Sequence, residues 1–550
     1  MNQKLDTCDN IMKNNITIRL ILIYLLMLTY GFSQDPVKQG KAEPRKNILV
    51  ILSDDQGYCE LEPFINIATK ENLDYFLPKS AGAPHIPLSQ LKHSVEEGME
   101  SARRCMPNIS KLSTKSVVFT DFYSAPTCAP ARAALMTGCY PQRFGVYTNW
   151  DTVSKNRGLN PDAKMLVKLF KDSGYYTGLV GKWHLGDEKG QHPNDKGFEY
   201  FFGFDRAHTE KYDSKILFRN RESVPAVGWL ADQITQESVD FIQRSDENSK
   251  PFFLYVAYNE PHGPNPLPPK MYQDEFKSES HRITTHYGNI YGMDYGIGKI
   301  IQKLKDIGQF DNTLIVFLSD NGVGYAPIHP FIPGSGPFRG GKWSPWEGGV
   351  RVPAVIYAKE FEHKTSNEIC TIFDLLPTAL DYAKISIPKD YVLDGKSLIP
   401  ILKGKPNDFS ERQLYWACDS LPPYGSMEWD PKFEELENRM IKVRDTTKAM
   451  KKEGKTHNWR GTTEPPALLV RNKKWKLMRW EETTPILIDM INDPYERKNV
   501  ASEFPEVVAK LHGDFKTWMG QMPKPVAYSD ELMKKLLITI PPPPLNKTSN

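Results

Sequence analysis

The chain has 550 residues, of which 25% are charged and 40% hydrophobic, and its formal net charge is +3. This composition is ordinary for a globular protein, and the length allows a large core and two or more structural units. A net charge so small on so long a chain gives no support for nucleic-acid binding, and no basic run exceeds what a solvated helix face carries. We therefore expect no nucleic-acid partner.

The N-terminus differs from the rest of the chain. Lys13 and Arg19 precede an apolar run that extends from Leu20 to Tyr30. The run is short for a membrane span but typical of the core of a secretory signal peptide; an N-terminal membrane anchor is the alternative. We expect residues 1–33 to be a signal peptide and 34–45 a linker, so that the mature protein is periplasmic or secreted and has no stable membrane span.

The chain has seven cysteines, and Cys8 would leave with the signal peptide. The other six are too sparse for a disulfide scaffold, and none has the C-x-x-C spacing of a zinc site. They allow one or two disulfides, whose pairing the sequence does not reveal.

Two similar segments predict buried parallel strands. The apolar run at 47–52 is followed by Ser-Asp-Asp-Gln-Gly, and the run at 312–318 is followed by Ser-Asp-Asn-Gly. Short apolar runs rich in β-branched residues are typical of strands buried on both faces. In open α/β sheets, ligands bind beyond the carboxyl ends of such strands. We therefore expect the polar residues after both strands to lie together: Asp54, Asp55, Asp320 and Asn321.

Helices and strands alternate between these two segments. The sequence predicts helices at 163–173, 231–244 and 289–307, and strands at 175–180 and 252–257. This alternation predicts an α/β fold with a large, mixed, mostly parallel sheet sandwiched by helices. We assign residues 46–420 to this domain and interpret 60–105, where periodicity is weak, as a surface insertion.

The C-terminal part has a different pattern. Residues 421–466 are charged and lack strand periodicity, whereas 467–470, 474–480 and 486–489 are typical of short antiparallel strands, and 505–522 of a packing helix. We expect a smaller α+β subdomain with a short antiparallel sheet at 421–530, followed by a disordered tail at 531–550.

A cysteine stands at the predicted start of a helix. Cys128 is followed by Pro130 at the second position and Arg132 at the fourth, within an alanine-rich segment. A helix N-terminus favours an anion, and an arginine fork suits oxyanions. A buried cysteine before an ordinary core helix explains the motif equally well. The motif alone therefore does not distinguish an anion-binding site from core packing.

The residues after the two matched strands form an all-oxygen donor set. Three carboxylates and one amide oxygen suit Ca²⁺ or Mg²⁺ rather than zinc. A lone pair of aspartates is more often found in a turn or a cap, but two such pairs after matched buried strands favour a metal site.

Four further polar residues follow strand ends or glycine-rich turns: Lys182, His184, His262 and Lys342. Each alone would be read as an ordinary surface or core residue. Collected at one metal, they would bind a tetrahedral anion, because two lysines neutralise its oxygens and a histidine protonates a leaving alkoxide.

The chain resembles the type I, formylglycine-dependent sulfatases of the alkaline-phosphatase-like superfamily. The resemblance extends from residue 47 to about 501 and includes Ala131, where serine is usual. It rests on the motifs Ser53-Asp54-Asp55-Gln56-Gly57, Cys128-Ala129-Pro130-Ala131-Arg132, Gly181-Lys182-Trp183-His184-Leu185-Gly186, Pro261-His262, Ser319-Asp320-Asn321-Gly322, Gly341-Lys342 to Pro353, and Asp493-Pro494-Tyr495-Glu496 with Asn499.

The resemblance implies how the reaction begins. A sulfatase-maturating enzyme would oxidise Cys128 to formylglycine (3-oxoalanine). One hydroxyl of the formylglycine hydrate would bind a Ca²⁺ ion, with Mg²⁺ less favoured, and attack the sulfur atom. The second hydroxyl then allows the aldehyde to re-form and sulfate to leave. The metal ligands would be Asp54, Asp55, Asp320, Asn321 and the modified residue 128.

The resemblance also implies roles for the pocket. Arg132 and His184 would hold the hydrate, and Lys182 and Lys342 would bind sulfate oxygens. His262 is favoured over His184 as the general acid towards the leaving alcohol.

The implied substrate is a sulfated carbohydrate, as polysaccharide or oligosaccharide. One alternative is a phosphodiesterase or phosphonate monoester hydrolase on the same scaffold. The other is a non-catalytic glycan-binding relative, but the presence of Cys128 and Arg132 argues against a loss of catalysis. Arg206, His208 and His329 are either sugar contacts or ordinary loop residues.

Overall fold

The computed structural model describes residues 44–69, 72, 94–149, 158–278, 280–324, 334–418, 467–479 and 484–523. Those from Lys46 onward belong to one compact unit. The predicted signal peptide, most of the linker, residues 70–93 of the predicted insertion (except Asn72), residues 421–466 and the predicted tail lie outside the described residues. The predicted domain boundaries therefore stay predictions.

A ten-stranded sheet forms the centre of the described fold. Its order is β11-β2-β10-β9-β1-β8-β4-β5-β6-β7. The strands β9, β1, β8, β4 and β5 run parallel, whereas β10, β6 and β7 are antiparallel to their neighbours. In sheet order the strands span Lys364–Ser366, Val117–Phe119, Ala354–Tyr357, Thr313–Ser319, Asn47–Ser53, Phe252–Ala257, Tyr176–Lys182, Tyr200–Phe204, Leu217–Arg219 and Glu222–Val224. The predicted mixed, mostly parallel sheet is thus confirmed.

The central strand β1 shows why the sheet is covered on both faces. Side chains alternate along a strand, so Ile48, Val50 and Leu52 pack into one hydrophobic core while Leu49 and Ile51 pack into a second. All seven residues of β1 are buried. An apolar run without alternation is therefore a strand with helices on both sides.

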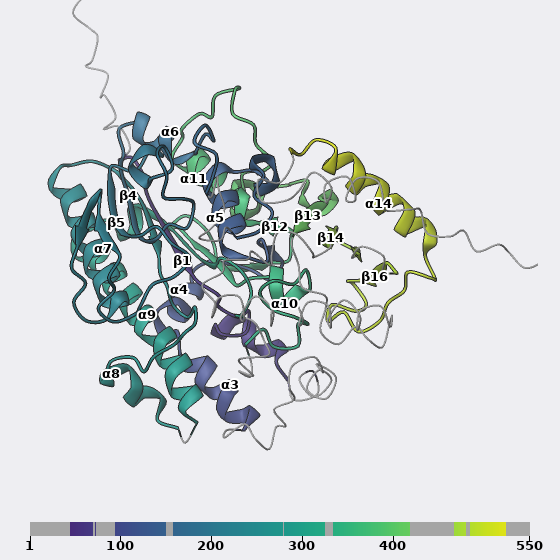
Figure 1. Cartoon of the computed structure of the whole chain (residues 1–550), viewed down its shortest axis with the longest axis horizontal. Helices are drawn as coiled ribbons and strands as arrows, with labels where there is room; N and C mark the ends of the chain where they lie inside the picture. Colours follow the sequence, from purple (N-terminus) through teal and green to yellow (C-terminus); the bar gives the residue numbers. More distant parts are fainter. Residues whose placement is uncertain are drawn as a thin grey trace, which may run out of the picture. The chain divides into compact units, whose positions relative to one another are not determined.

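Helices cover the two faces of the sheet (Figure 1). Helices α5 (Cys128–Thr137), α6 (Val167–Asp172) and α11 (Leu375–Tyr382) contribute to the first core. Helices α3 (Val95–Arg104), α4 (Pro107–Ser113), α7 (Leu230–Glu247) and α9 (His281–Asp306) contribute to the second. Shorter helices α8 (Lys270–Gln273), α10 (Glu347–Val350) and α12 (Ile399–Leu402) lie in the connections.

Two predicted helices differ from the observed ones at their starts. Helix α6 begins at Val167 rather than at residue 163, because the N–H of Leu166 bonds to the carbonyl of Met136 instead of to a preceding turn. Helix α9 begins at His281 rather than at 289, and its first turns are buried at Ile283 and His286.

A separate four-stranded antiparallel sheet confirms the predicted smaller α+β part. Its order is β13-β14-β15-β16, and the strands span Leu414–Cys418, Ala467–Arg471, Trp475–Arg479 and Ile486–Asp489. Helix α14 (Pro505–Met519) packs on it, with the Trp518 ring stacked on Tyr415 at 5.3 Å. Strand β13 was not predicted and precedes the predicted boundary at 421.

Three strands of this small sheet bond to segments of the larger domain. The indole N–H of Trp416 on β13 donates to the carbonyl of Ser124 (2.9 Å). Arg471 on β14 donates to the hydroxyl of Tyr123 (3.1 Å), and the Nζ of Lys476 on β15 lies 2.7 Å from a Glu347 carboxylate oxygen. Ser124 precedes α5 and Glu347 begins α10, so the small sheet is bonded to segments beside the predicted catalytic residues.

The five cysteines whose side chains are described, Cys59, Cys105, Cys128, Cys139 and Cys370, are all free and buried. No disulfide therefore forms among them. Within the described residues, no helix combines the length and apolarity needed to cross a membrane.

Candidate active site

The two matched strands place their polar residues at one edge of the sheet. Strands β1 and β9 pair in register, so that Ser53 lies opposite Ser319, and Asp54 and Asp320 follow them. The N–H of Asp320 donates to the carbonyl of Ser53 (3.0 Å), which extends the pairing one residue further. The predicted meeting of the two acidic strand ends is observed.

Asp55 turns the chain back toward Asp320. Its φ of 66° lies in the left-handed region, which aspartate tolerates better than most residues. In this conformation its N–H donates to Asp320 Oδ1 (3.1 Å), and Asn321 Nδ2 donates to Asp55 Oδ1 (2.7 Å). The Oδ1 atom of Asn321 is buried and has no hydrogen-bond partner among the described residues.

The oxygen donors fit a hard cation. A buried amide oxygen without a partner, beside carboxylates, is the kind of atom that a divalent cation would satisfy. Asp54, Asp55, Cys128 and His262 each offer a donor atom within 4.8 Å of the others'. Asp320, which the sequence also predicts as a ligand, is instead engaged through one oxygen by Asp55 N–H and through the other by Arg132.

Helix α5 carries Cys128 in its first turn. The thiol is 1% exposed, with Sγ 3.5 Å from Asp54 Oδ1 and 3.0 Å from Lys342 Nζ. The N–H of Ala129 is capped by the Asn149 side chain (2.9 Å), a contact that the sequence did not predict. Burial raises the pKa of the Cys128 thiol to about 12 despite Lys182 and Lys342, so the helix terminus does not produce a thiolate.

Arg132 lies one turn later and is fully buried. Its Nη2 and Nε atoms lie 2.8 and 3.2 Å from Asp320 Oδ2, and Nη2 lies 3.7 Å from Asp54 Oδ1. The remaining Nη1 donates to the carbonyl of Lys182 and to the hydroxyl of Tyr255, at 3.1 and 3.3 Å. The guanidinium is therefore held rigidly beneath the carboxylates.

The two lysines reach the site from different segments. Lys182 ends β4, and its Nζ lies 2.7 Å from Asp54 Oδ2. It follows Gly181, which must be glycine because a Cβ there would stand 1.9 Å from the carbonyl oxygen of Ala257. Lys342 comes from the loop before α10, and its Nζ lies 2.7 Å from Asp55 Oδ1.

Opposing effects set the pKa values of the carboxylates. Burial would raise the pKa of Asp54, but Lys182, His262, Arg132 and Lys342 together hold it well below its usual range. Burial would likewise raise that of Asp55, which Lys342 and His262 lower. For Asp320, burial and the neighbouring Asp54 raise the pKa, because Arg132 does not fully offset them.

The two predicted histidines differ in exposure. His184 is buried, and burial together with Lys182 lowers its pKa well below the usual range, so it is neutral. His262 is 17% exposed, with Nδ1 2.6 Å from the Gly263 carbonyl and Nε2 3.7 Å from Asp55 Oδ2. Because a carbonyl only accepts, Nδ1 carries the proton in the neutral ring and Nε2 faces the site. Burial and Lys342 lower the His262 pKa to about 4.

The structure brings together every site residue that the sequence predicted. Beyond these it adds Tyr255 and Asn149, which carry no sequence signal because one lies in a core strand and the other in a loop. Arg206 and His208 lie in one loop and are both exposed, and His208 approaches His262. His329 lies outside the described residues.

Comparison with known proteins identifies the family. The sulfatase family model matches residues 46–385, which is more than half of the chain. The chain belongs to the sulfatase family. The family lies within the alkaline-phosphatase-like superfamily, as the motifs predicted.

Individual relatives extend this match. The uncharacterized sulfatase YdeN of Escherichia coli K12 is 32% identical over 524 residues, which cover 90% of this chain and 89% of YdeN. Human N-acetylgalactosamine-6-sulfatase is 34% identical over 345 residues, covering 57% of this sulfatase and 64% of the human enzyme. The crystal structure of Ps i-CgsB superposes with a TM-score of 0.68 at 25% identity, covering 90% of this chain and 98% of that one.

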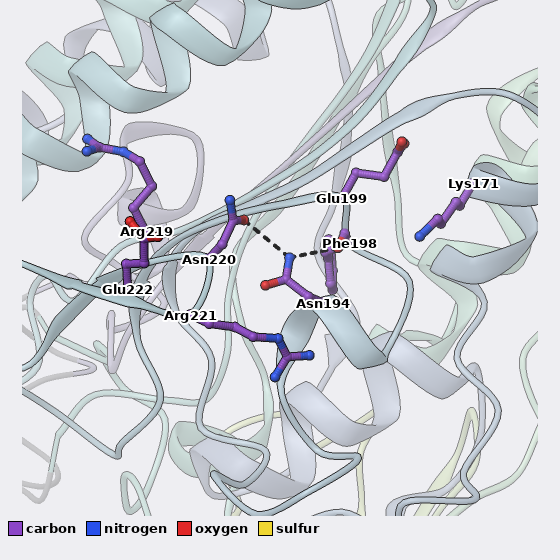
Figure 2. A pocket seen from close by; sticks show the side chains of 8 residues that line it. All are labelled: Lys171, Asn194, Phe198, Glu199, Arg219, Asn220, Arg221 and Glu222. Carbon is purple, nitrogen blue, oxygen red and sulfur yellow. Dashed lines mark hydrogen bonds between the residues drawn. The ribbon is translucent and has the colours of Figure 1, made fainter.

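A pocket of about 620 Å³ is lined by residues just before β5 and by residues of the β6–β7 hairpin (Figure 2). Its two arginines are paired locally, Arg219 with Glu237 and Arg221 with Asp195. Figure 2 shows Asn194 bonded to Asn220 and to the Phe198 carbonyl. No residue that lines this pocket belongs to the candidate active site.

Proposed function

We propose that this sulfatase releases inorganic sulfate from a sulfated polysaccharide or oligosaccharide. The family supports the reaction, and a relative whose name makes it a sulfatase of N-acetylgalactosamine 6-sulfate supports the substrate class. The observation that carries the proposal is the position of Cys128 Sγ, 3.0 Å from Lys342 Nζ and 3.5 Å from Asp54 Oδ1. The residue to be modified thus stands between a sulfate-binding cation and a metal-binding carboxylate.

The proposed metal is Ca²⁺, with Mg²⁺ as the less favoured choice. The proposed ligands are Asp54, Asp55, Asp320, Asn321 and residue 128. The Oδ1 atom of Asn321 is buried and has no hydrogen-bond partner among the described residues, so this oxygen can bind the metal. The His262 ring is also close enough to contribute, but the all-oxygen set suits a hard cation better. When bound, such an ion lowers the pKa of a coordinated hydroxyl and neutralises negative charge.

Residue 128 would be matured to formylglycine by a sulfatase-maturating enzyme. A thiol whose pKa is raised to about 12 is a poor nucleophile at neutral pH, which is consistent with a need for modification. The hydrated aldehyde supplies one hydroxyl as nucleophile and a second from which sulfate can be expelled.

Lys182 and Lys342 would bind the non-bridging sulfate oxygens. Both ammonium groups are buried, so their attraction to an anion is weakened little by water. Arg132, fixed by Asp320, Lys182 and Tyr255, would orient residue 128 together with His184. These residues bind and orient the reacting groups.

His262 would donate the proton to the leaving oxygen. The bond of Nδ1 to Gly263 fixes the ring so that Nε2 faces the site. A pKa of about 4 makes the ring neutral in the absence of a ligand. A bound sulfate ester adds a negative charge near Nε2, which raises the pKa of His262 toward the value that a general acid needs.

The proposed location is the periplasm or the medium. The predicted signal peptide at 1–33 supports export. Edman sequencing of the protein from its native host checks this: we expect an N-terminus near residue 34, and an intact Met1 would contradict cleavage of a signal peptide.

The decisive experiment combines modification with activity. We expect the Cys128 peptide of active protein to have the mass of formylglycine, and sulfate release from sulfated oligosaccharides to disappear in Cys128→Ala. Active protein with only unmodified cysteine would contradict the mechanism. A kcat/KM for an aryl phosphodiester above that for the aryl sulfate would instead indicate a phosphodiesterase.

A further inference from the structure

Two loops frame the exposed side of His262. The first spans residues 205–216 and the second spans 259–267; we call them the mouth loops. The side chain of Asn259 donates to the carbonyl of Thr209 (3.2 Å), and the Tyr212 hydroxyl donates to the carbonyl of Leu267 (3.0 Å). Between these two contacts, Lys211 Nζ reaches Asn265 Oδ1 at 2.5 Å. The mouth loops are therefore fixed to each other at three positions, which lie on both sides of His262 and directly after His208.

Lys211 also links the first mouth loop to helix α9. It is 3% exposed and also bonds to Asn289 on α9 (3.0 Å). Asn265 in turn donates to the carbonyl of Pro261, one residue before His262. The first mouth loop thus has a defined position relative to His262.

His208 and His262 stack across the mouth loops. Their ring centroids lie 5.6 Å apart with an angle of 14° between the planes. His208 is the more exposed of the two, and no step of the proposed reaction uses it. The leaving oxygen must lie at Nε2 of His262, and the group attached to that oxygen must extend toward solvent, since Lys182, His184 and Arg132 are buried whereas His262 is partly exposed. The ring of His208 stands beside this outward path.

We propose that His208 recognises the sugar that carries the scissile sulfate, by contact with a hydroxyl group of that sugar. The proposal rests on the proposed sulfatase function and extends it to the leaving group. A small aryl leaving group has no hydroxyl for His208 to bind. The residue therefore contributes to the choice of substrate and takes no part in bond cleavage.

The electrostatic environment favours a hydroxyl over a second sulfate group as the partner of His208. Partial burial and the charge of Lys182 lower the pKa of His208, so that the ring is uncharged at neutral pH. A neutral imidazole both donates and accepts hydrogen bonds, as a hydroxyl does, but lacks the charge that attracts a sulfate.

The test compares two substrates in each variant. Para-nitrophenyl sulfate is the sugar-free probe, and the second probe is whichever of a panel of sulfated oligosaccharides, N-acetylgalactosamine 6-sulfate included, has the highest wild-type kcat/KM. We expect His208→Ala to lower the ratio of sugar to aryl kcat/KM by about tenfold or more, the effect of losing a hydrogen bond to substrate. His208→Asn, which keeps a donor and an acceptor, should restore part of the ratio. Lys215→Ala, an exposed substitution in the same loop, is the control.

The outcomes separate this proposal from the function on which it rests. Equal losses on both substrates in His208→Ala would contradict the role of His208 and leave the sulfatase function intact. A wild-type enzyme active on the aryl sulfate but on none of the sugars would contradict both the carbohydrate substrate and the role of His208. Far-ultraviolet circular dichroism of His208→Ala establishes that the variant is folded.

Discussion

Two buried clusters have the same number of positive and negative side chains but differ in their surroundings. The active-site cluster comprises Asp54, Asp55, Asp320, Arg132, Lys182 and Lys342. The C-terminal cluster comprises Asp121, Glu347, Glu496, Arg351, Arg471 and Lys476. Each contains three carboxylates and three cations, and both are largely buried. Charge balance and burial therefore do not distinguish a reactive site from a structural one.

The C-terminal cluster is closed by its own contacts. Lys476 Nζ lies 2.7 Å from Glu347 and 2.6 Å from Glu496, and the backbone N–H of Glu347 donates to Glu496 (2.9 Å). The other Glu347 oxygen accepts from Tyr123 (2.9 Å) and Arg351 (3.2 Å). Its carboxylate is thus bound on both sides.

The active-site cluster instead adjoins a reactive residue and an unsatisfied oxygen. It contacts Cys128, lies beside the Asn321 Oδ1 atom, which has no hydrogen-bond partner within the described part of the chain, and opens to solvent past His262. What distinguishes the two clusters is an unsatisfied acceptor, an adjoining thiol and an opening. Substitutions in the active-site cluster should therefore affect chemistry, and those in the C-terminal cluster should affect folding.

The largest expected effect follows removal of Cys128, the residue proposed to be modified. Cys128→Ala should lower sulfate release by about 10⁴-fold or more, because no nucleophile remains. Sulfate release from para-nitrophenyl sulfate, measured by ion chromatography, checks this. A loss of less than about tenfold would show that another group attacks sulfur.

Matched lysine substitutions compare the clusters directly. Lys182→Met should lower kcat/KM by about 10²–10³-fold, as expected for a lost oxyanion contact. Lys476→Met should lower the free energy of unfolding by about 3–5 kcal/mol, since it leaves two buried carboxylates without their lysine. Urea denaturation and kinetics per folded molecule measure these effects. The comparison fails if Lys476→Met reduces the activity of folded molecules as strongly as Lys182→Met does.

Stabilisation by a metal ion should depend on the active-site cluster and not on the C-terminal cluster. Ca²⁺ at a hundred times its Kd should stabilise the wild-type protein by about 2.7 kcal/mol through binding to the folded state alone. Asp55→Asn should abolish most of this gain, whereas Glu347→Gln should retain it. Thermal unfolding with EDTA and with added Ca²⁺ measures the difference. An equal gain in both variants would place the metal elsewhere.

The last prediction concerns pH. Burial and the nearby Glu347 raise the pKa of Glu496 to about 7, from 4.5 in a solvated chain. The folded protein thus holds this proton more tightly than the unfolded chain, and the resulting stability is lost as pH rises from about 4.5 through about 7. Glu496→Gln, which mimics the protonated acid, should remove this fall. Tm measured against pH checks this; parallel profiles for both proteins would contradict the raised pKa.

The central fold and the active site were predictable for the same reason. The strands β1, β8 and β9 are continuous apolar runs, and the residues that follow them must meet at one sheet edge. The short strands β6, β7 and β11 were missed because three partly exposed residues carry no periodic signal. Asn149 and Tyr255 were missed because their contacts depend on tertiary packing and not on local pattern.

The sequence also did not reveal which distant residues form hydrogen bonds or ion pairs with each other. Arg132 was predicted to serve the site, but its bonds to Tyr255 and to the Lys182 carbonyl join residues more than forty positions apart. The link between Lys476 and Glu347 spans 129 positions. Sequence patterns indicate which residues are polar and buried, whereas three-dimensional packing decides which ones pair.

The contacts of β13, β14 and β15 with the larger domain set a limit on how the chain can be divided. The sulfatase family model ends at residue 385, before any of these strands. A chain that stopped there would lose the buried partners of the Ser124 carbonyl, the Tyr123 hydroxyl and the Glu347 carboxylate. The region by which the family is recognised therefore leaves out buried partners of residues that lie beside the candidate active site.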